Sequence, residues 1–169
     1  MADATKIQLG VCSVTRNGTD LGHSIGGVTI TYTPQYHKTK VDKYGDTLVE
    51  EFLVGEELAA EFNLAEFTLA NLQVAVPEGT AVGDDSISIG SQAGKRASDN
   101  AVAWIFHPIA NAAGNRNDDV TIYKGVVTNE IKLEHKNDGE KVIPIKVEAL
   151  VDEGRSDGNL LGYIGDSIS

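Results

Sequence analysis

The chain has 169 residues, 41% of them hydrophobic, which suits one globular domain over residues 1–169 with a sizeable core. Its formal net charge of −11 argues against a nucleic-acid clamp, which needs a basic groove. The single cysteine, Cys12, excludes an intrachain disulfide and a cysteine-rich zinc site. The sequence contains neither an apolar window of membrane-spanning length nor the apolar run of a signal peptide, so we expect the chain to fold in a cytoplasm.

The first part of the chain carries strand patterns separated by turn signals. Residues 6–14 are typical of a strand, and Asn17-Gly18 favours a type I′ hairpin turn. After Gly26-Gly27, residues 28–33 alternate apolar side chains with threonine, which predicts a half-buried strand. We expect Pro34 to end this strand.

A long polar connection follows at residues 34–48, about fifteen residues rich in charged and aromatic side chains. Compact domains rarely keep a connection of this length without a function, and exposed loops usually carry binding. We therefore predict that this loop is an assembly arm that joins one copy of the protein to the next. Its candidate contact residues are Tyr36, Lys40, Asp42, Lys43, Tyr44, Gly45, Asp46 and Thr47.

Residues 49–62 predict a further strand, with Glu57 and Glu61 on a wet face. Asn63 and Glu66 have the spacing of a capping box, and the apolar stripe after them predicts a short helix that Pro77 closes.

The rest of the chain is strand-rich. Patterns at residues 86–89, 101–109, 120–135 and 141–151 predict strands, the last two joined by a tight hairpin at Asn137-Asp138-Gly139. A final apolar patch covers residues 160–164. About seven or eight strands and one helix predict a mainly β fold, a sandwich or barrel-like pair of antiparallel sheets with one flanking α-helix.

Catalytic and metal-binding signatures are weak. The pairs at residues 84–85 and 118–119 are more typical of turn acids than of calcium ligands, and residues 90–96 lack the spacing of a phosphate loop. A Ser/His/Asp triad is spatial and stays open, but no nucleophile elbow marks one. We expect no cofactor, no metal and no enzymatic activity. The scattered histidines lack zinc-site spacing: His23, His37, His107 and His135.

Several segments, in order along most of the chain, resemble the major tail tube protein of long-tailed, non-contractile bacteriophages. Asp-Lys-Tyr-Gly-Asp-Thr at residues 42–47 is the most specific of them, whereas residues 81–117 carry no recognised motif. The segments are residues 17–22, 26–28, 41–47, 55–56, 64–66 and 141–152.

The resemblance implies a virion protein, assembled in the host bacterial cytoplasm, that forms hexameric rings. One sheet of each subunit would join its neighbours in a β-barrel that lines the tube. The stacked rings would enclose a tape-measure protein, meet tail terminator and tip proteins, and later conduct double-stranded DNA without specific binding. The long loop would contact the adjacent ring.

An acidic channel wall would repel phosphates and so let DNA pass. The candidate lumen residues lie on three strand patterns, with Lys132 and Lys146 interleaved, and the alternative is that these faces are solvated outer faces. They are Glu57, Glu61, Glu130, Glu134 and Glu148.

Other functions fit the same fold class. A secretion-system tube or a tube-initiating tail-tip protein shares the architecture, and a carbohydrate- or receptor-binding β-sandwich is a more distant alternative. Such a binding module would favour aromatic residues clustered on loops, whereas aromatics make up 6% of this chain and several lie in strand patterns.

Overall fold

The structure, a computed structural model, describes residues 10–90, 92–134 and 139–166, and its strands outnumber its helices. The prediction of a mainly β fold with one α-helix is confirmed for these residues. The elements are β1 (Cys12–Arg16), β2 (Thr19–Asp20), β3 (Ser24–Lys40), η2 (Asp42–Tyr44), β4 (Leu48–Leu64), α1 (Leu69–Ala75), β5 (Thr80–Val82), β6 (Ser86–Ser88), η3 (Ala97–Asn100), β7 (Val102–Pro108), β8 (Val120–Val127), β9 (Ile143–Leu150) and β10 (Gly162–Ile164).

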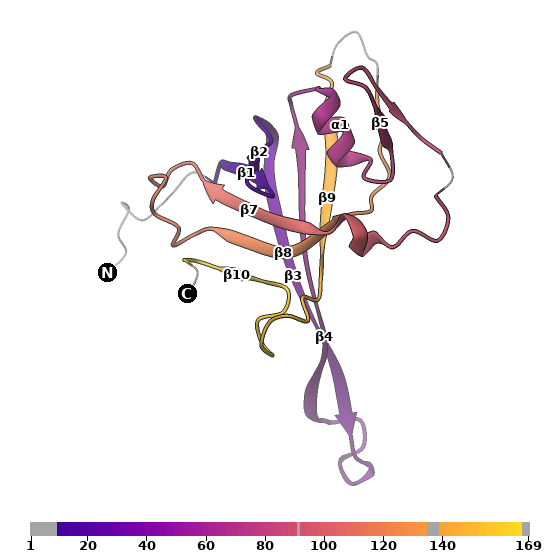
Figure 1. Cartoon of the computed structure of the whole chain (residues 1–169). Helices are drawn as coiled ribbons and strands as arrows, with labels where there is room; N and C mark the ends of the chain where they lie inside the picture. Colours follow the sequence, from indigo (N-terminus) through magenta and orange to yellow (C-terminus); the bar gives the residue numbers. More distant parts are fainter. Residues whose placement is uncertain (1–9, 91, 135–138, 167–169) are drawn as a thin grey trace.

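One antiparallel sheet forms the body. Its strand order is β2-β1-β7-β8-β9-β4-β3, and β10 joins it beside β8. Figure 1 shows β7 and β8 running across the direction of β3, β4 and β9, so the sheet turns back over itself in a sandwich-like arrangement. The turn occurs at β8, whose first half pairs with β10 and whose second half pairs with β9. The hairpin of β5 and β6 is a separate two-stranded sheet.

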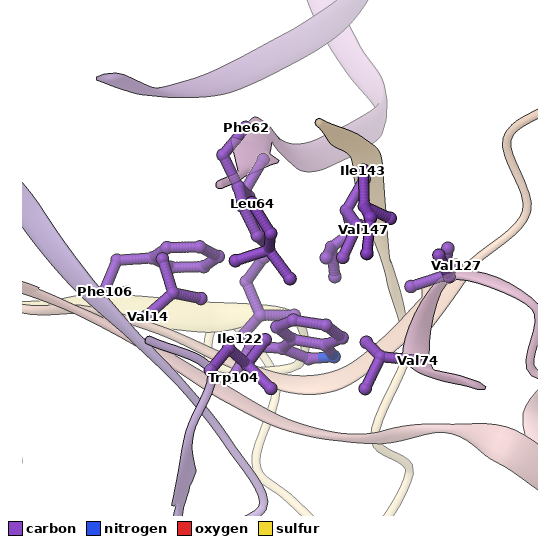
Figure 2. Packing of buried hydrophobic residues seen from close by; sticks show 14 residues of the cluster. Val14, Phe62, Leu64, Val74, Trp104, Phe106, Ile122, Val127, Ile143 and Val147 are labelled. Carbon is purple, nitrogen blue, oxygen red and sulfur yellow. The ribbon is translucent and has the colours of Figure 1, made fainter. Parts of the chain in front are cut away.

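The hydrophobic core fills the space between the two crossing parts of the sheet. Phe62 of β4 meets Trp104 and Phe106 of β7 edge to face, with ring centroids 6.1 and 5.9 Å apart. The buried Trp104 indole donates a hydrogen bond to the carbonyl oxygen of Gly125, 3.2 Å away. Figure 2 shows Leu64 directed toward the same centre. The inward side chains of β4 are thus built into the core together with those of β7.

The predicted turn at Asn17-Gly18 is confirmed. Arg16 pairs with Thr19, which leaves a two-residue connection between β1 and β2. Asn17 has φ 47° and Gly18 has φ 81°, the two positive angles of a type I′ turn.

The structure corrects the loop predicted at residues 34–48. Residues 34–40 continue β3, paired with β4, and only residues 41–47 connect the two strands. Pro34 does not end the strand because β3 is the last strand of the sheet, and an edge strand tolerates a missing N–H that faces away from the ladder. The long loop is therefore a long β-hairpin with a short turn.

The helix begins later than the capping pattern predicts. Asn63 and Leu64 are the last residues of β4, and α1 starts after Thr68. The Thr68 hydroxyl accepts a hydrogen bond from the Asn71 backbone N–H at 3.2 Å. Glu66 instead accepts a hydrogen bond from the His23 backbone N–H at 3.0 Å. Pairing with β9 holds Asn63 in the sheet, which overrides its local preference for a helix cap.

Two other strand boundaries differ from prediction. β1 starts at Cys12, and residues 6–9 of the predicted strand lie outside the described residues. β8 ends at Val127, and residues 128–134 and 139–142 are not strand. The strands beside the predicted hairpin thus stop well short of it, while His135, Asn137 and Asp138 lie outside the described residues. The strands predicted near residues 86–89, 101–109 and 141–151 are confirmed as β6, β7 and β9.

Two phenylalanines of β4 separate the contributions of the core and of the distal hairpin. Phe62 is 4% exposed and Phe52 is 57% exposed. We expect Phe62→Ala to lower the free energy of unfolding by about 3–5 kcal/mol, because it empties the centre of the aromatic cluster. Phe52→Ala should change it by less than about 0.5 kcal/mol. Urea denaturation followed by tryptophan fluorescence measures both, and equal losses would contradict this account of the core.

Candidate functional site

The most prominent feature outside the body is the arm, which we define as residues 34–54. It comprises the distal parts of β3 and β4 and the turn between them. Figure 1 shows the arm extending past the ends of the other strands, away from the core. Tyr36 pairs with Leu53, and the ladder continues until Lys40 pairs with Leu48. The arm is thus an ordered extension of two body strands.

Polar side chains tie the end of the arm together. Lys38 Nζ lies 3.5 Å from Glu51 Oε1 across the two strands. Lys40 Nζ lies 3.1 Å from Asp46 Oδ1. These ion pairs are exposed, so they contribute little to stability. They do place positive and negative side chains next to each other at fixed positions on the tip.

Large apolar side chains are exposed along the arm. Val54 is 66% exposed, Phe52 57% and Tyr36 51%. An apolar surface of this kind on a projecting hairpin is typical of a protein contact site, since no described residue of the body buries it. The exposed apolar residues of the arm are Tyr36, Val41, Tyr44, Leu48, Val49, Phe52, Leu53 and Val54.

The structure divides the predicted loop residues among three elements. Tyr36 and Lys40 belong to β3, whereas Asp42, Lys43 and Tyr44 form η2. The remaining three, Gly45, Asp46 and Thr47, complete the turn. Sequence reasoning missed Phe52, Leu53 and Val54, because their apolar run was interpreted as an ordinary body strand. The signal available was the absence of alternation in Phe-Leu-Val, which does not fit a half-buried strand.

A second feature is the free edge of β3. β3 is 17 residues long and stands at the end of the sheet, paired within the described chain to β4 alone. Its other side therefore presents a row of unpaired backbone groups, a template for another strand. Most proteins keep edge strands short or block them. An edge of this length favours pairing with a further chain.

A third feature is the charged outer face of β4 and β9, which we call the carboxylate face. It carries Glu57 and Glu61 of β4 and Glu148 of β9. Lys146 lies between them, with its Nζ 3.1 Å from Glu148 Oε1 and 3.8 Å from Glu61 Oε1. The hydrogen bond to Glu148, and then the carboxylate charges, raise the pKa of Lys146. Threonines 29, 31 and 33 of β3 extend this face beside β4.

Two predicted lumen residues do not belong to this face. Glu130 and Glu134 lie beyond Val127, where β8 ends, so they are not on a strand as predicted. In this segment Ile131 packs against the hydrophobic core, although no strand partner is present among the described residues. The structure thus places Glu57, Glu61 and Glu148 on neighbouring strands, and Glu130 and Glu134 on the segment that follows β8.

Three neighbouring residues with catalytic potential, Ser13, His107 and Asp119, are joined by hydrogen bonds. His107 Nδ1 lies 2.6 Å from Asp119 Oδ1, and Asp119 is buried. Ser13 Oγ donates to the backbone oxygen of His107 at 3.4 Å, not to its ring, so these three do not form a nucleophilic triad. Burial, and then the charge of Asp119, raise the pKa of the Cys12 thiol, which makes it a poor nucleophile.

Metal ligands are not grouped in the described part of the chain. Within residues 10–90, 92–134 and 139–166, no three His, Cys, Asp or Glu side chains converge on a possible metal position. Of the histidines, His23 lies on the surface near Glu66 and His37 lies in the arm.

A groove lies where the arm joins the body. It has a volume of about 420 Å³ and runs between β4 and the C-terminal segment at residues 160–164. Tyr32 and Leu58 line one side, and Tyr163 lines the other. The Tyr32 hydroxyl donates to Glu56 Oε1 at 2.5 Å, which raises the pKa of Tyr32. The groove extends the apolar surface of the arm onto the body.

None of the helices described is both long enough and apolar enough to cross a lipid bilayer. No protein-family model matches the chain, and no curated protein matches it at a significant level.

Lys146 links the carboxylates of this face, so its removal tests their mutual repulsion. We expect Lys146→Gln to lower the melting temperature in 10 mM salt and to have a much smaller effect in 1 M salt, which screens exposed charges. The pKa of Lys146 is raised by folding, so its contribution is present below pH about 10.4 and is lost as the pH rises through the folded pKa. Lys95→Gln, in a loop far from this face in sequence, is the control. A salt-independent loss would show that packing dominates.

Proposed function

We propose that the protein is a structural subunit that assembles head to tail into hexameric rings, and that these rings stack into a tube for DNA delivery, like the major tail tube protein of non-contractile bacteriophages. The observation that carries the proposal is the arm. A hairpin that projects from the body with apolar side chains along it has no role in folding its own domain, and suits contact with another subunit.

The arm supports stacking of one ring on the next. It is rooted in the body, because β3 and β4 both continue from the body into the arm and stay paired there, with one register shift between Gln35 and Tyr36. A rooted arm loses less conformational freedom on binding than a disordered loop does. Tyr36 and Phe52 supply contact area, and Lys38 with Glu51 supplies charges that fix register.

The free edge of β3 supports ring formation. A contact between this edge and a different surface of the next copy is heterologous, and such a contact closes into a ring when its rotation allows. Ring closure would pair the edge and so remove the aggregation hazard that an exposed strand carries.

The carboxylate face supports the proposed channel. It lies on the same strands as the free edge, so a sheet continued from subunit to subunit through β3 would bring many copies of it together. Glu57, Glu61 and Glu148 outnumber Lys146 there, which leaves a net negative wall. Such a wall repels phosphates, so that DNA passes without being held.

In this function the protein resides in the virion and is assembled in the host bacterial cytoplasm. Its proposed partners are further copies of itself, a tape-measure protein inside the tube, and tail terminator and tip proteins at the ends. The arm and the free edge would serve equally in a secretion-system tube or a tube-initiating tail-tip protein. A tape-measure gene close downstream would favour the tail tube over both.

Purified protein should form rings or hollow tubes when its concentration is raised. Negative-stain electron microscopy and mass photometry measure this directly. A protein that remains strictly monomeric at millimolar concentration under all solution conditions would contradict the proposal. Binding to glycan arrays without any self-assembly would favour a receptor-binding module instead.

A shortened arm separates stacking from folding. In the variant, residues 38–51 are replaced by Asn-Gly, which joins His37 to its cross-strand partner Phe52 by a tight turn. We expect unchanged thermal unfolding and ring formation, but no stacking into tubes, because the arm tip is missing.

Point variants control for the loss of chain length. The pair Tyr36→Ser and Phe52→Ser should weaken stacking, whereas Val82→Ser and Ile89→Ser, also exposed but outside the arm, should not. Tubes of normal length from the shortened arm would refute the stacking role.

A further inference from the structure

The outer edge of β9 is only partly occupied by a strand. On its inner side β9 pairs with β4 from Ile143 to Glu148. On its outer side β8 pairs with β9 only from Val147 to Leu150. The stretch from Ile143 to Lys146 therefore has no strand on its outer side among the described residues. An open edge at this place would be a second site for strand pairing, besides the edge of β3.

The side chain of Asn129 occupies this open stretch. Its Oδ1 accepts a hydrogen bond from the Lys146 backbone N–H at 2.9 Å. Its Nδ2 donates to the Pro144 backbone oxygen at 3.2 Å. A single amide thus takes the two backbone groups that a neighbouring strand would use. Asn129 lies two residues after the end of β8, and Ile131, packed against the core, holds this segment in place.

The pattern of these two bonds matches parallel strand pairing. In a parallel ladder the hydrogen bonds are slanted. The N–H and the C=O of one residue therefore bond two different residues of the other strand, which lie immediately before and after the residue opposite to it. Asn129 does this to Pro144 and Lys146, which flank Ile145. In an antiparallel hydrogen-bonded pair, by contrast, both bonds go to the same residue. The amide therefore imitates a parallel strand.

A ring would place a parallel strand at this position. β3 is antiparallel to β4, and β4 is antiparallel to β9, so β3 and β9 run in the same direction. Cyclic symmetry keeps that direction in every copy. If the edge of β3 in one subunit meets the β9 edge of the next, the new pairing is parallel. The backbone pattern that Asn129 imitates is then the one that the neighbour would supply.

We propose that Asn129 is a displaceable plug of the β9 edge, which is exchanged for β3 of a second copy when the ring closes. This inference rests on the proposed ring assembly. In the free subunit the plug satisfies Lys146 N–H and Pro144 C=O, and so disfavours premature pairing. In the ring those groups bond the neighbour, and the Asn129 amide turns to water. Because hydrogen bonds are exchanged rather than lost, the plug raises the concentration needed for assembly without blocking it.

Removal of the plug should therefore promote assembly. Asn129→Ala leaves two backbone groups of the free subunit without protein partners, while the ring keeps its own bonds. We expect the critical concentration for ring formation to fall about fivefold, and the lag before assembly to shorten. The matched control is Asn111→Ala, whose side chain donates to Asp118 in a loop and touches no sheet edge.

Two measurements on the monomer test the plug without any assembly. The Lys146 amide should exchange with deuterium at least tenfold faster in Asn129→Ala than in the wild type or in Asn111→Ala. A synthetic peptide with the sequence of residues 28–35, taken from β3, should bind Asn129→Ala about fivefold more tightly than it binds the wild type or Asn111→Ala. Should Asn129→Ala unfold, Asn129→Asp keeps the acceptor for Lys146 but loses the donor to Pro144, and should show the same peptide binding.

The outcomes separate this inference from the proposed function. If the wild type assembles but the variants bind the peptide no more tightly and keep its critical concentration, the plug is refuted and the ring stands. If no form assembles, the proposed function fails, and the peptide still decides whether Asn129 guards a pairing edge. Slower assembly of Asn129→Ala, with unchanged exchange at Lys146, would likewise overturn the plug.

Discussion

The structure depends on the position of β4. Within the body β4 is paired with a neighbouring strand on each side, whereas outside the body it is paired with one strand only. Residues 59–64 pair with β3 and with β9, and their inward side chains reach the aromatic cluster around Phe62. Residues 48–58 pair with β3 alone. The core thus anchors one half of each long strand, and the backbone ladder transmits that position to the arm. A hairpin supported in this way needs no core of its own.

Local patterns predicted the elements whose partners lie close in sequence or whose faces are half buried. Asn17-Gly18 defines its turn through the positive φ angles, and the alternation after Val28 matches the half-buried side chains of Val28 and Ile30, although Tyr32 is 54% exposed. Two boundaries that depend on the surrounding sheet were predicted wrongly. Asn63 has the side chain of a helix cap, but β9 keeps it in the sheet. Pro34 ends most strands, but the edge position of β3 removes its cost.

The candidate site was predictable in composition and not in shape. The charged and aromatic residues of the arm stood out, yet their polarity suggested a loop, because an isolated hairpin with two wet faces lacks the alternation that marks a buried strand. Glu57, Glu61 and Glu148 could be placed on strands from their alternation. Glu130 could not be placed in this way. The segment after β8 contacts the core through Ile131 and the edge of β9 through the Asn129 amide, and the alternation of apolar and polar residues does not reveal these contacts.

The ladder of the arm contains a register shift between Gln35 and Tyr36, where Gly55 and Leu53 are the partners and Val54 is an extra residue. A one-residue shift moves every later side chain of that strand to the opposite face. Val54 therefore places Glu51 on the same face as Lys38, within reach of its ion pair. Changes in the length of the two strands are then coupled. A matched loss of one residue from each strand exchanges the two faces of the tip relative to the body, whereas a matched loss of two residues from each strand, or a change within the turn, preserves them. The faces of the arm therefore stay in phase with the body only when the length of the ladder changes in steps of two residues per strand.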